Sequence, residues 1–162
     1  MSVIFFDPSP IISIQYNDIK LLKTKALESP LKRARICLHF NNTDTIQEML
    51  IAFCKNSYIR PHRHIDKTES FHIIEGKGVV FFFDDDGNVI KYIYIDNSNT
   101  FIYKLSEPLW HTVIPITEFL VIHEVTTGPF IKDESTYAVW APKDDEYHEI
   151  QLFTEKLLTI IS

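Results

Sequence analysis

The chain has 162 residues, 45% of them apolar, and carries a formal net charge of −6. This length suits one domain spanning residues 1–162, and the composition is that of a globular protein rather than a disordered or fibrous one. The acidic balance excludes the overall basic field that nucleic-acid binding requires, so we expect no nucleic-acid partner.

The N-terminal residues Met1 to Pro8 lack the basic start and the long apolar run of a signal peptide. No apolar run in the sequence reaches the length that crosses a membrane. We therefore expect a cytoplasmic protein with no membrane partner. Cys37 and Cys54 are not spaced as a metal-binding pair, and in a reducing compartment we expect them to be buried free thiols.

The first part of the chain predicts one helix. Residues 3–16 are typical of irregular chain or a short strand. Asn17 or Asp18 can cap a helix over residues 17–29, and Pro30 ends it. The apolar face of this helix carries Ile19, Leu22, Ala26 and Leu27. We interpret the helix as an outer brace or a lid.

From residue 35 the pattern changes to short strands. We expect strands at residues 35–40, 47–54, 57–64, 69–75, 79–83, 89–95, 100–105, 109–114 and 118–125. The segment 47–54 is apolar at both parities, which is typical of a strand covered on two sides. Regularly spaced short strands predict an all-β barrel or sandwich over about residues 35–142. A helix over about residues 145–160 follows.

Three side chains of metal-binding type follow one another at short range: His62, His64 and Glu69. On a strand, residues i and i+2 point to the same face, so the two imidazoles share one direction. The residues after His64 can turn the chain and let Glu69 begin the next strand. Two imidazoles and a carboxylate suit one divalent ion such as Fe, Mn, Zn or Ni, with positions left open for chemistry. The alternative is a chance pair of histidines on an exposed edge.

A fourth ligand is expected from a distant strand, because the strands of a closed barrel converge on its axis. His111 is the best candidate for this position. It follows Pro108 and shares parity with Leu109 and Val113, whose side chains we expect to face inward.

These residues resemble the two motifs of the cupin superfamily. The first motif matches His62, His64, Glu69 and Gly76, and the second matches Pro108 and His111. The resemblance implies a cupin fold, which is a double-stranded β-helix or jelly-roll barrel, with a metal ion held by the three histidines and the glutamate. It also implies a homodimer, because cupins often pair through sheet edges.

Several segments are similar to the WbuC-type cupin-fold metalloproteins in particular. They are Tyr58 to His64, Lys67 to Gly76, Gly128-Pro129-Phe130 and Trp140-Ala141-Pro142. The likeness extends over about residues 20–145. Proteins of this type are encoded with bacterial surface-polysaccharide genes, so the resemblance implies a role in O-antigen or capsule biosynthesis.

Three residues are candidate catalytic bases: His39, Tyr58 and His123. Tyr58 shares parity with His62 and His64, and we expect it at the mouth of the site. A core histidine with its hydrogen bonds satisfied is an equal alternative for His39. For His123 the favoured interpretation is the core or the wall of the pocket.

Arg60, Arg63 and Lys67 surround the two histidines and are candidate substrate-binding residues. A local basic rim attracts an anion such as a sugar acid or a nucleotide-sugar, although solvated side chains are the alternative. Trp110 can offer a flat face to a sugar ring, or it can simply be buried in the core. His72 lies at the opposite strand parity, so we expect it to face away from the metal.

Three functions fit these predictions. The first is a metal-dependent isomerase or epimerase acting on a sugar or nucleotide-sugar, in which the metal polarises an oxygen atom. The same ligand set also serves an Fe-dependent dioxygenase. The third function is that of a non-catalytic metal-containing module that binds or senses a sugar.

Overall fold

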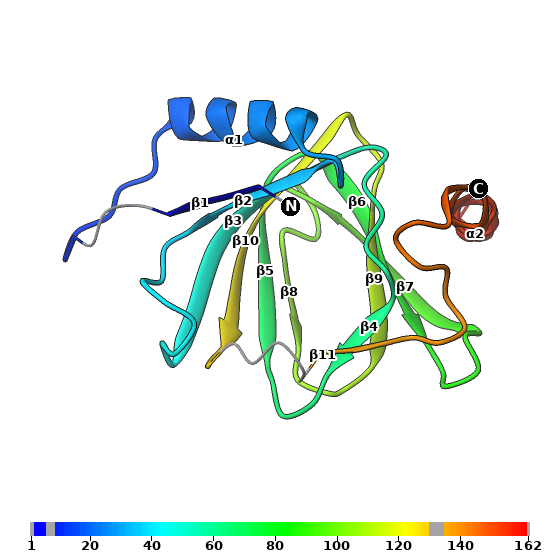
Figure 1. Cartoon of the computed structure of the whole chain (residues 1–162). Helices are drawn as coiled ribbons and strands as arrows, with labels where there is room; N and C mark the ends of the chain where they lie inside the picture. Colours follow the sequence, from blue (N-terminus) through cyan, green and yellow to red (C-terminus); the bar gives the residue numbers. More distant parts are fainter. Residues whose placement is uncertain (1, 6–8, 130–134, 162) are drawn as a thin grey trace.

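Two curved sheets face each other around a shared interior, and a helix from each end of the chain lies outside them (Figure 1). The structure is a computed structural model, and it describes residues 2–5, 9–129 and 135–161. The arrangement confirms the predicted all-β jelly-roll barrel with two flanking helices.

The six-stranded sheet has the order β1-β2-β3-β10-β5-β8. Its strands are β1 (Ser2–Phe5), β2 (Arg33–Cys37), β3 (Ile46–Cys54), β10 (Phe119–Thr127), β5 (Glu69–Glu75) and β8 (Ile102–Leu105). The first two strands run parallel, and all other neighbours are antiparallel. This sheet supplies the predicted glutamate, at the first residue of β5.

The five-stranded sheet has the order β11-β4-β9-β6-β7 and is antiparallel throughout. Its strands are β11 (Ser135–Tyr137), β4 (His62–His64), β9 (Trp110–Pro115), β6 (Lys77–Phe83) and β7 (Val89–Asp96). This sheet supplies all three predicted histidines. The site therefore forms only when the two sheets face each other.

The predicted strand over residues 57–64 is much shorter in the structure, where only His62–His64 pairs as β4. The preceding residues are held by other contacts. Ser57 Oγ donates to the carbonyl of Leu31 at 3.2 Å. Pro61 has no N–H to give to a sheet ladder, so a proline just before His62 marks the first position at which pairing begins.

Alternate residues of β3 face two different cores. The barrel interior takes Met49, Ile51 and Phe53, and the space beneath helix α1 takes Leu50, Ala52 and Cys54. Helix α1 spans Tyr16–Glu28. This two-sided burial explains why the segment is apolar at both parities.

Helix α1 lies on the outer surface of the six-stranded sheet, so it is a brace and not a lid (Figure 1). The Asp18 carboxylate accepts the Gln15 N–H at 2.7 Å and so caps the start of the helix. The helix buries Ile19, Leu22 and Ala26. Leu27 is 51% exposed, which corrects its assignment to the apolar face. It follows Ala26 directly and is therefore rotated by about 100° around the helix.

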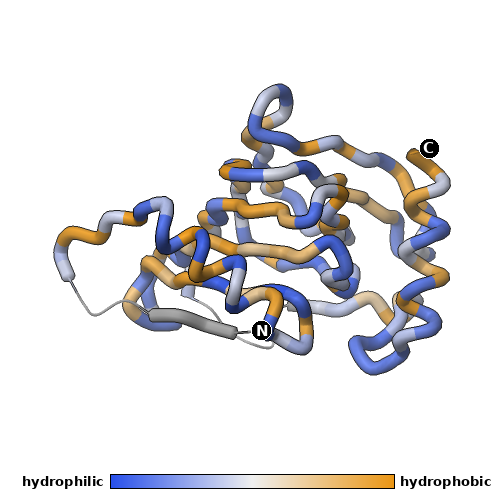
Figure 2. Tube along the Cα trace, turned by 90° about the horizontal axis from the view of Figure 1, so that it is seen from above, coloured by the Kyte–Doolittle hydropathy of each residue, from blue (hydrophilic) through white to orange (hydrophobic). Residues whose placement is uncertain are grey.

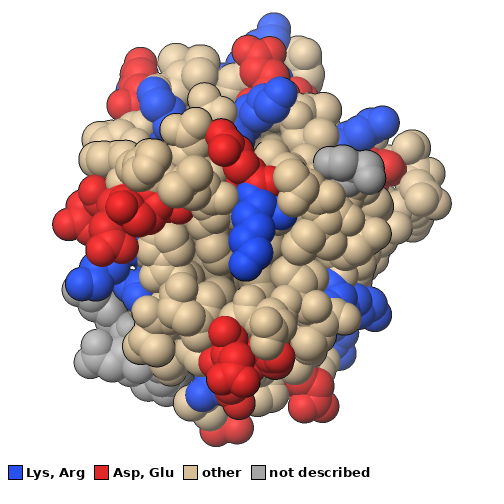
Figure 3. All heavy atoms as spheres, turned by 90° about the vertical axis from the view of Figure 1, so that its right-hand side faces the viewer, with Lys and Arg blue, Asp and Glu red and all other residues tan. Residues whose placement is uncertain are grey.

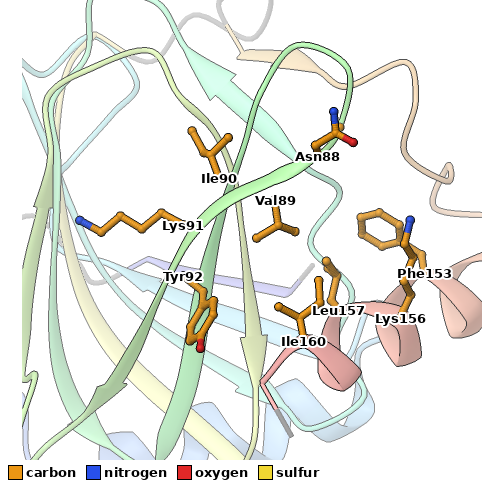
Figure 4. A pocket seen from close by; sticks show the side chains of 10 residues that line it. Asn88, Val89, Ile90, Lys91, Tyr92, Phe153, Lys156, Leu157 and Ile160 are labelled. Atoms are coloured by element: carbon orange, nitrogen blue, oxygen red, sulfur yellow. The ribbon is translucent and has the colours of Figure 1, made fainter.

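Helix α2 (Tyr147–Ile160) forms where the apolar spacing predicts it and packs on the outside of the five-stranded sheet. Its Leu157 joins a core with Phe81 and Phe83. A cavity of about 410 Å³ remains between β7 and this helix, lined in part by Val89 and Leu157 (Figure 4). This cavity is separate from the barrel interior.

A tight turn joins β6 to β7. The Asp84 carboxylate accepts the N–H groups of Asp86 at 3.0 Å and Asn88 at 2.8 Å. Gly87 has φ of 86°, and a Cβ atom placed on it would lie 2.7 Å from the Trp140 ring. Both the backbone angle and the lack of space therefore require glycine at this position.

Charges of both signs are interspersed on the face of the molecule that carries α2 (Figure 3). In the view from above, apolar and polar residues alternate along much of the chain (Figure 2). Cys37 and Cys54 are buried and free, as predicted. Within the described residues, neither helix has the length and apolarity needed to cross a membrane.

Candidate metal centre

Three histidines meet on the inner face of the five-stranded sheet. His62 on β4 and His111 on β9 are direct partners in the strand register, and their ring centroids lie 4.5 Å apart. His64 follows two residues after His62 on the same face, with its ring 4.9 Å from His62 and 5.7 Å from His111. One nitrogen from each ring lies within 4.8 Å of the others. This spacing is that of ligand atoms around a shared centre.

Glu69 reaches the same centre from the opposite sheet. Its Oε1 lies 3.1 Å from His111 Nε2, and its Oε2 lies 3.6 Å from His64 Nε2. The Tyr103 hydroxyl donates to Oε1 at 2.9 Å. The carboxylate is only 4% exposed. The structure therefore brings together all four side chains that the two sequence motifs single out.

Two of the histidine rings are oriented by carbonyl groups just before their strands. His62 Nδ1 lies 2.9 Å from the Arg60 carbonyl, and His111 Nδ1 lies 2.9 Å from the Leu109 carbonyl. A carbonyl oxygen only accepts, so each Nδ1 carries a proton and each Nε2 is the atom presented to the centre. A hydrogen bond of this kind fixes the ring orientation that a metal ligand needs.

Burial and mutual charge set the protonation of these groups. Burial, together with the neighbouring His111 and His64, lowers the pKa of His62 to about 3. Burial also lowers the pKa of His64, against the opposing effect of Glu69. Although burial alone raises the pKa of Glu69, the surrounding histidines bring it below its usual range. Neutral imidazoles and an ionised carboxylate are the forms that bind metals.

His111 is the exception. Burial lowers its pKa, but the Glu69 carboxylate and the Leu109 carbonyl together raise it above its ordinary value. Its Nε2 is nevertheless a buried polar atom with no hydrogen bond of good geometry among the described residues, although Glu69 Oε1 is only 3.1 Å away. A buried ring nitrogen without a hydrogen bond suits an atom that coordinates a metal ion. The donor set of three imidazoles and one carboxylate fits a divalent ion of the Fe, Mn, Ni or Zn type.

A cavity of about 320 Å³ opens beside the histidines in the barrel interior. Its wall includes His39, which is a predicted catalytic base, and the predicted substrate-binding residues Arg60 and Lys67. Arg60 donates to the Ala138 carbonyl at 2.6 Å, and Lys67 donates to the Pro129 carbonyl at 2.9 Å. The His39 ring is anchored through Nδ1, which lies 2.9 Å from the Glu48 carbonyl oxygen. These three residues are placed where a bound ligand meets them.

Tyr58 lies away from the cavity mouth, contrary to its predicted position. Its hydroxyl donates to the Pro142 carbonyl at 2.8 Å, and its ring packs edge-on against Phe153 of α2. Burial raises the pKa of this hydroxyl far above its usual range. Residues before β4 are not paired as a strand, so strand parity does not carry back from His62 to Tyr58.

His123 also lies outside the cavity. It is paired with His72 across β10 and β5, and both side chains are on the outer face of the six-stranded sheet. His123 Nε2 lies 2.9 Å from a carboxylate oxygen of Glu48. The predicted role of His123 as a base or pocket wall is therefore not supported by its position. His72 does face away from the metal centre, as predicted.

Arg63 and Trp110 form a contact outside the barrel. The Arg63 guanidinium lies 4.3 Å from the centre of the Trp110 ring, and both side chains donate to Asp85. Trp110 is only 8% exposed and packs in the core under α2. Because His62, His64 and His111 face inward, their strand neighbours face outward. Neither residue lines the cavity in which the predicted substrate would bind.

Four residues near the centre were not singled out from the sequence: Arg33, Arg35, Tyr103 and Glu124. Tyr103 holds Glu69, and the other three line the cavity. A usable signal was present for Glu124, since it continues the inward parity of Leu120 and Ile122. A charged residue at an inward position of an apolar strand calls for a functional explanation.

Solved structures of similar shape identify the class of fold. The capsular polysaccharide assembling protein CapF of Staphylococcus aureus superposes with a TM-score of 0.53 at 17% identity, over 60% of this chain and 29% of that chain. Protein SO0799 of Shewanella oneidensis superposes with a TM-score of 0.51 at 7% identity, over 64% of this chain and 72% of that chain. The chain thus corresponds to less than a third of CapF, and at these identities the likeness concerns the fold alone. That fold is the cupin fold.

The chain belongs to the family described as a domain of unknown function, DUF6016, whose model matches residues 14–95. The matched segment includes His62, His64 and Glu69 and ends before His111. No curated protein matches the chain.

Proposed function

We propose that this protein is a metal-dependent enzyme of the cupin class that acts on a sugar or a sugar derivative in bacterial surface-polysaccharide biosynthesis, as an isomerase or epimerase. The observation that carries the proposal is the convergence of three histidines and a glutamate beside the cavity of the barrel interior. The biosynthetic context is supported by the resemblance to the WbuC-type proteins.

His62, His64, Glu69 and His111 would hold one divalent ion, because they offer three imidazole nitrogens and a carboxylate to one point. Such an ion, when bound, supplies a positive centre that polarises a substrate carbonyl or hydroxyl oxygen. The cavity beside the histidines positions the rest of the substrate. At about 320 Å³ it is near the lower end for ligand pockets, so it suits one sugar ring better than a complete nucleotide-sugar.

Isomerisation also needs a group that moves a proton, and two residues in the cavity wall are suitable. His39 is anchored through one ring nitrogen to the backbone of Glu48. Glu124 is the second candidate. Burial and the neighbouring Glu69 carboxylate raise its pKa to about 8, although Arg35 opposes this shift. A carboxyl group with this pKa both accepts and releases a proton near neutral pH.

The test is incubation of the metal-loaded protein with candidate sugars, sugar acids and nucleotide-sugars in D₂O, followed by NMR of the recovered sugar. The proposal expects solvent deuterium at one sugar carbon with the wild type. It expects no exchange with Glu124→Gln or with the ligand variant His62→Ala, and normal exchange with the surface variant His72→Ala. Absence of deuterium from every sugar, together with retained metal, would refute proton-transfer isomerisation and favour a non-catalytic binding module.

A further inference from the structure

The cavity wall has an unusual excess of positive charge for an acidic chain. Four of its residues are cationic: Arg33, Arg35, Arg60 and Lys67. Among the described residues, two carboxyl side chains belong to the same wall, those of Glu124 and Asp144. Three of the four arginines in the whole sequence therefore face one cavity of a protein with net charge −6.

These three arginines reach the cavity for topological reasons. Arg33 and Arg35 alternate on β2 and lie opposite Phe53 and Ile51, two cavity residues of β3. The intervening Ala34 faces the core beneath α1. Arg60 enters from the segment that leads into β4. The guanidinium groups thus come from β2 and from the segment before β4, and all three line the same cavity.

Their hydrogen bonds go to neutral acceptors. Arg33 donates to the Tyr58 carbonyl at 2.7 Å, and Arg60 donates to the Ala138 carbonyl at 2.6 Å. Within residues 9–129 and 135–161, no carboxylate lies within salt-bridge distance of any of the three guanidinium groups. Burial accordingly lowers the pKa of Arg33, even though Asp144 partly opposes the effect.

Arg35 is the least satisfied of the three. Its one hydrogen-bonding contact among the described residues is a long 4.0 Å approach of Nη1 to the Met49 sulfur. Its Nε is buried with no hydrogen-bond partner. The charge of Arg35 lowers the pKa of Glu124, on the next strand but one, but burial opposes this and favours the neutral form of Glu124. The Arg35 side chain is half-buried. Because a buried guanidinium N–H without an oxygen acceptor is costly, the position of Arg35 calls for an acceptor from outside the chain.

We propose that Arg35, supported by Arg33 and Arg60, forms a carboxylate-binding subsite in the metal cavity, so that the natural ligand is a small organic acid such as a sugar acid. The inference deepens the proposed function and rests on the same cavity. A guanidinium with a free edge binds a planar carboxylate through two parallel N–H···O bonds. Arg33 and Arg60 already donate to backbone carbonyls, so one guanidinium with a free edge remains. It matches a carboxylate group, which carries a single charge, better than a phosphate group, which carries nearly two charges.

The test is isothermal titration calorimetry on metal-free protein with malonate as the probe. Malonamide is the matched neutral control, because it has nearly the same shape and carries no charge. We expect malonate to bind at least about tenfold more tightly than malonamide, the effect of hydrogen bonds to a charged group. Inorganic phosphate should bind more weakly than malonate. Equal binding of malonate and malonamide, or tighter binding of phosphate, would overturn the carboxylate subsite.

Three variants test whether Arg35 is the residue that binds malonate. Arg35→Met should reduce malonate binding at least about tenfold, and Arg35→Lys should give an intermediate loss because it keeps the charge but not the two-pronged geometry. Arg63→Met is the control, since Arg63 lies outside the cavity, and it should bind malonate as the wild type does. Unchanged binding in Arg35→Met would contradict the proposal.

The same variants separate a ligand role from a structural one. Removal of an unsatisfied guanidinium should leave the melting temperature of Arg35→Met unchanged or higher, whereas a clear fall would show that Arg35 supports the fold instead. Metal content, measured in parallel, tests the proposed function independently. Preference for malonate without metal binding would refute the metal centre alone, and metal binding without this preference would refute the carboxylate subsite alone.

Discussion

The Glu69 carboxylate and the His111 imidazole meet across the barrel interior, with 3.1 Å between Oε1 and Nε2. Glu69 belongs to one sheet and His111 to the other, and both side chains are almost completely buried. Tyr103 supports the carboxylate with a hydrogen bond at 2.9 Å, and the Leu109 carbonyl orients the imidazole. The contact therefore links the closure of the barrel to the geometry of the candidate metal centre.

Tyr103→Phe should weaken metal binding without removing a ligand. The variant loses the one hydroxyl that orients Glu69, and loss of such a supporting hydrogen bond typically lowers metal affinity by about tenfold or more. We also expect about 1 kcal/mol less stability. Competition for Zn²⁺ with a chelating dye measures the affinity. Tyr92→Phe, on the exposed side of β7, is the control, and equal affinity in the two variants would show that Tyr103 plays no part in the centre.

Glu124→Gln should change how stability depends on pH. In the folded protein, burial and Glu69 raise the pKa of Glu124 from 4.5 to about 8. Between these values the folded state holds a proton that the unfolded chain has released, so wild-type stability falls as pH rises from about 5 to about 8. We expect Glu124 to lower the free energy of unfolding by roughly 2 kcal/mol or more over this pH range.

Urea unfolding of the metal-free protein at several pH values measures this dependence. Glu124→Gln keeps the neutral shape of the protonated acid and should flatten the curve, being the more stable protein near pH 8. The exposed Glu107→Gln is the control and should follow the wild type. Parallel curves for wild type and Glu124→Gln would mean that Glu124 is ionised in the folded state.

Gly87→Ala should destabilise the β6–β7 hairpin and the packing of α2 together. The substitution forces a side chain into a left-handed backbone conformation and places its Cβ 2.7 Å from the Trp140 ring. We expect a loss of about 1 to 3 kcal/mol in the free energy of unfolding. Chemical unfolding measures it, with Asn97→Ala in the exposed turn after β7 as the control. A loss no larger than that of the control would show that the turn adapts freely.

The first metal motif was predictable because it is local. His62, His64 and Glu69 lie within eight residues, and strand parity together with one turn determines their relative positions. His111 is distant in sequence, and it was reached through parity on a short strand. Its pairing with His62 across β4 and β9 shows why that reasoning succeeded.

The remaining site residues show where parity reasoning ends. Parity assigned His123 to the face of Val121, which is correct, but that face packs beneath α1 and not around the cavity. The same parity argument, applied to the neighbours of His62 and His111, would have excluded Arg63 and Trp110. Which of two faces encloses a cavity depends on how the sheets pack, and a strand pattern alone does not contain that information.

The arginines illustrate a different difficulty. Arg33 and Arg35 alternate on a strand, which is also the pattern of a solvated face in an antiparallel sheet. In the structure it is the intervening Ala34 that is packed under α1, so the arginines face inward. The presence of a helix on the outer side reverses the usual assignment of polar residues to solvent.

The metal content of the purified protein tests the central claim most directly. After dialysis against metal-free buffer and reloading with a single divalent metal, elemental analysis should find about one ion per chain in the wild type and in the control variant His72→Ala. His62→Ala and His111→Ala should each retain far less than one. Stoichiometric metal in both of these variants, or none in the wild type, would contradict the centre formed by the three histidines and Glu69.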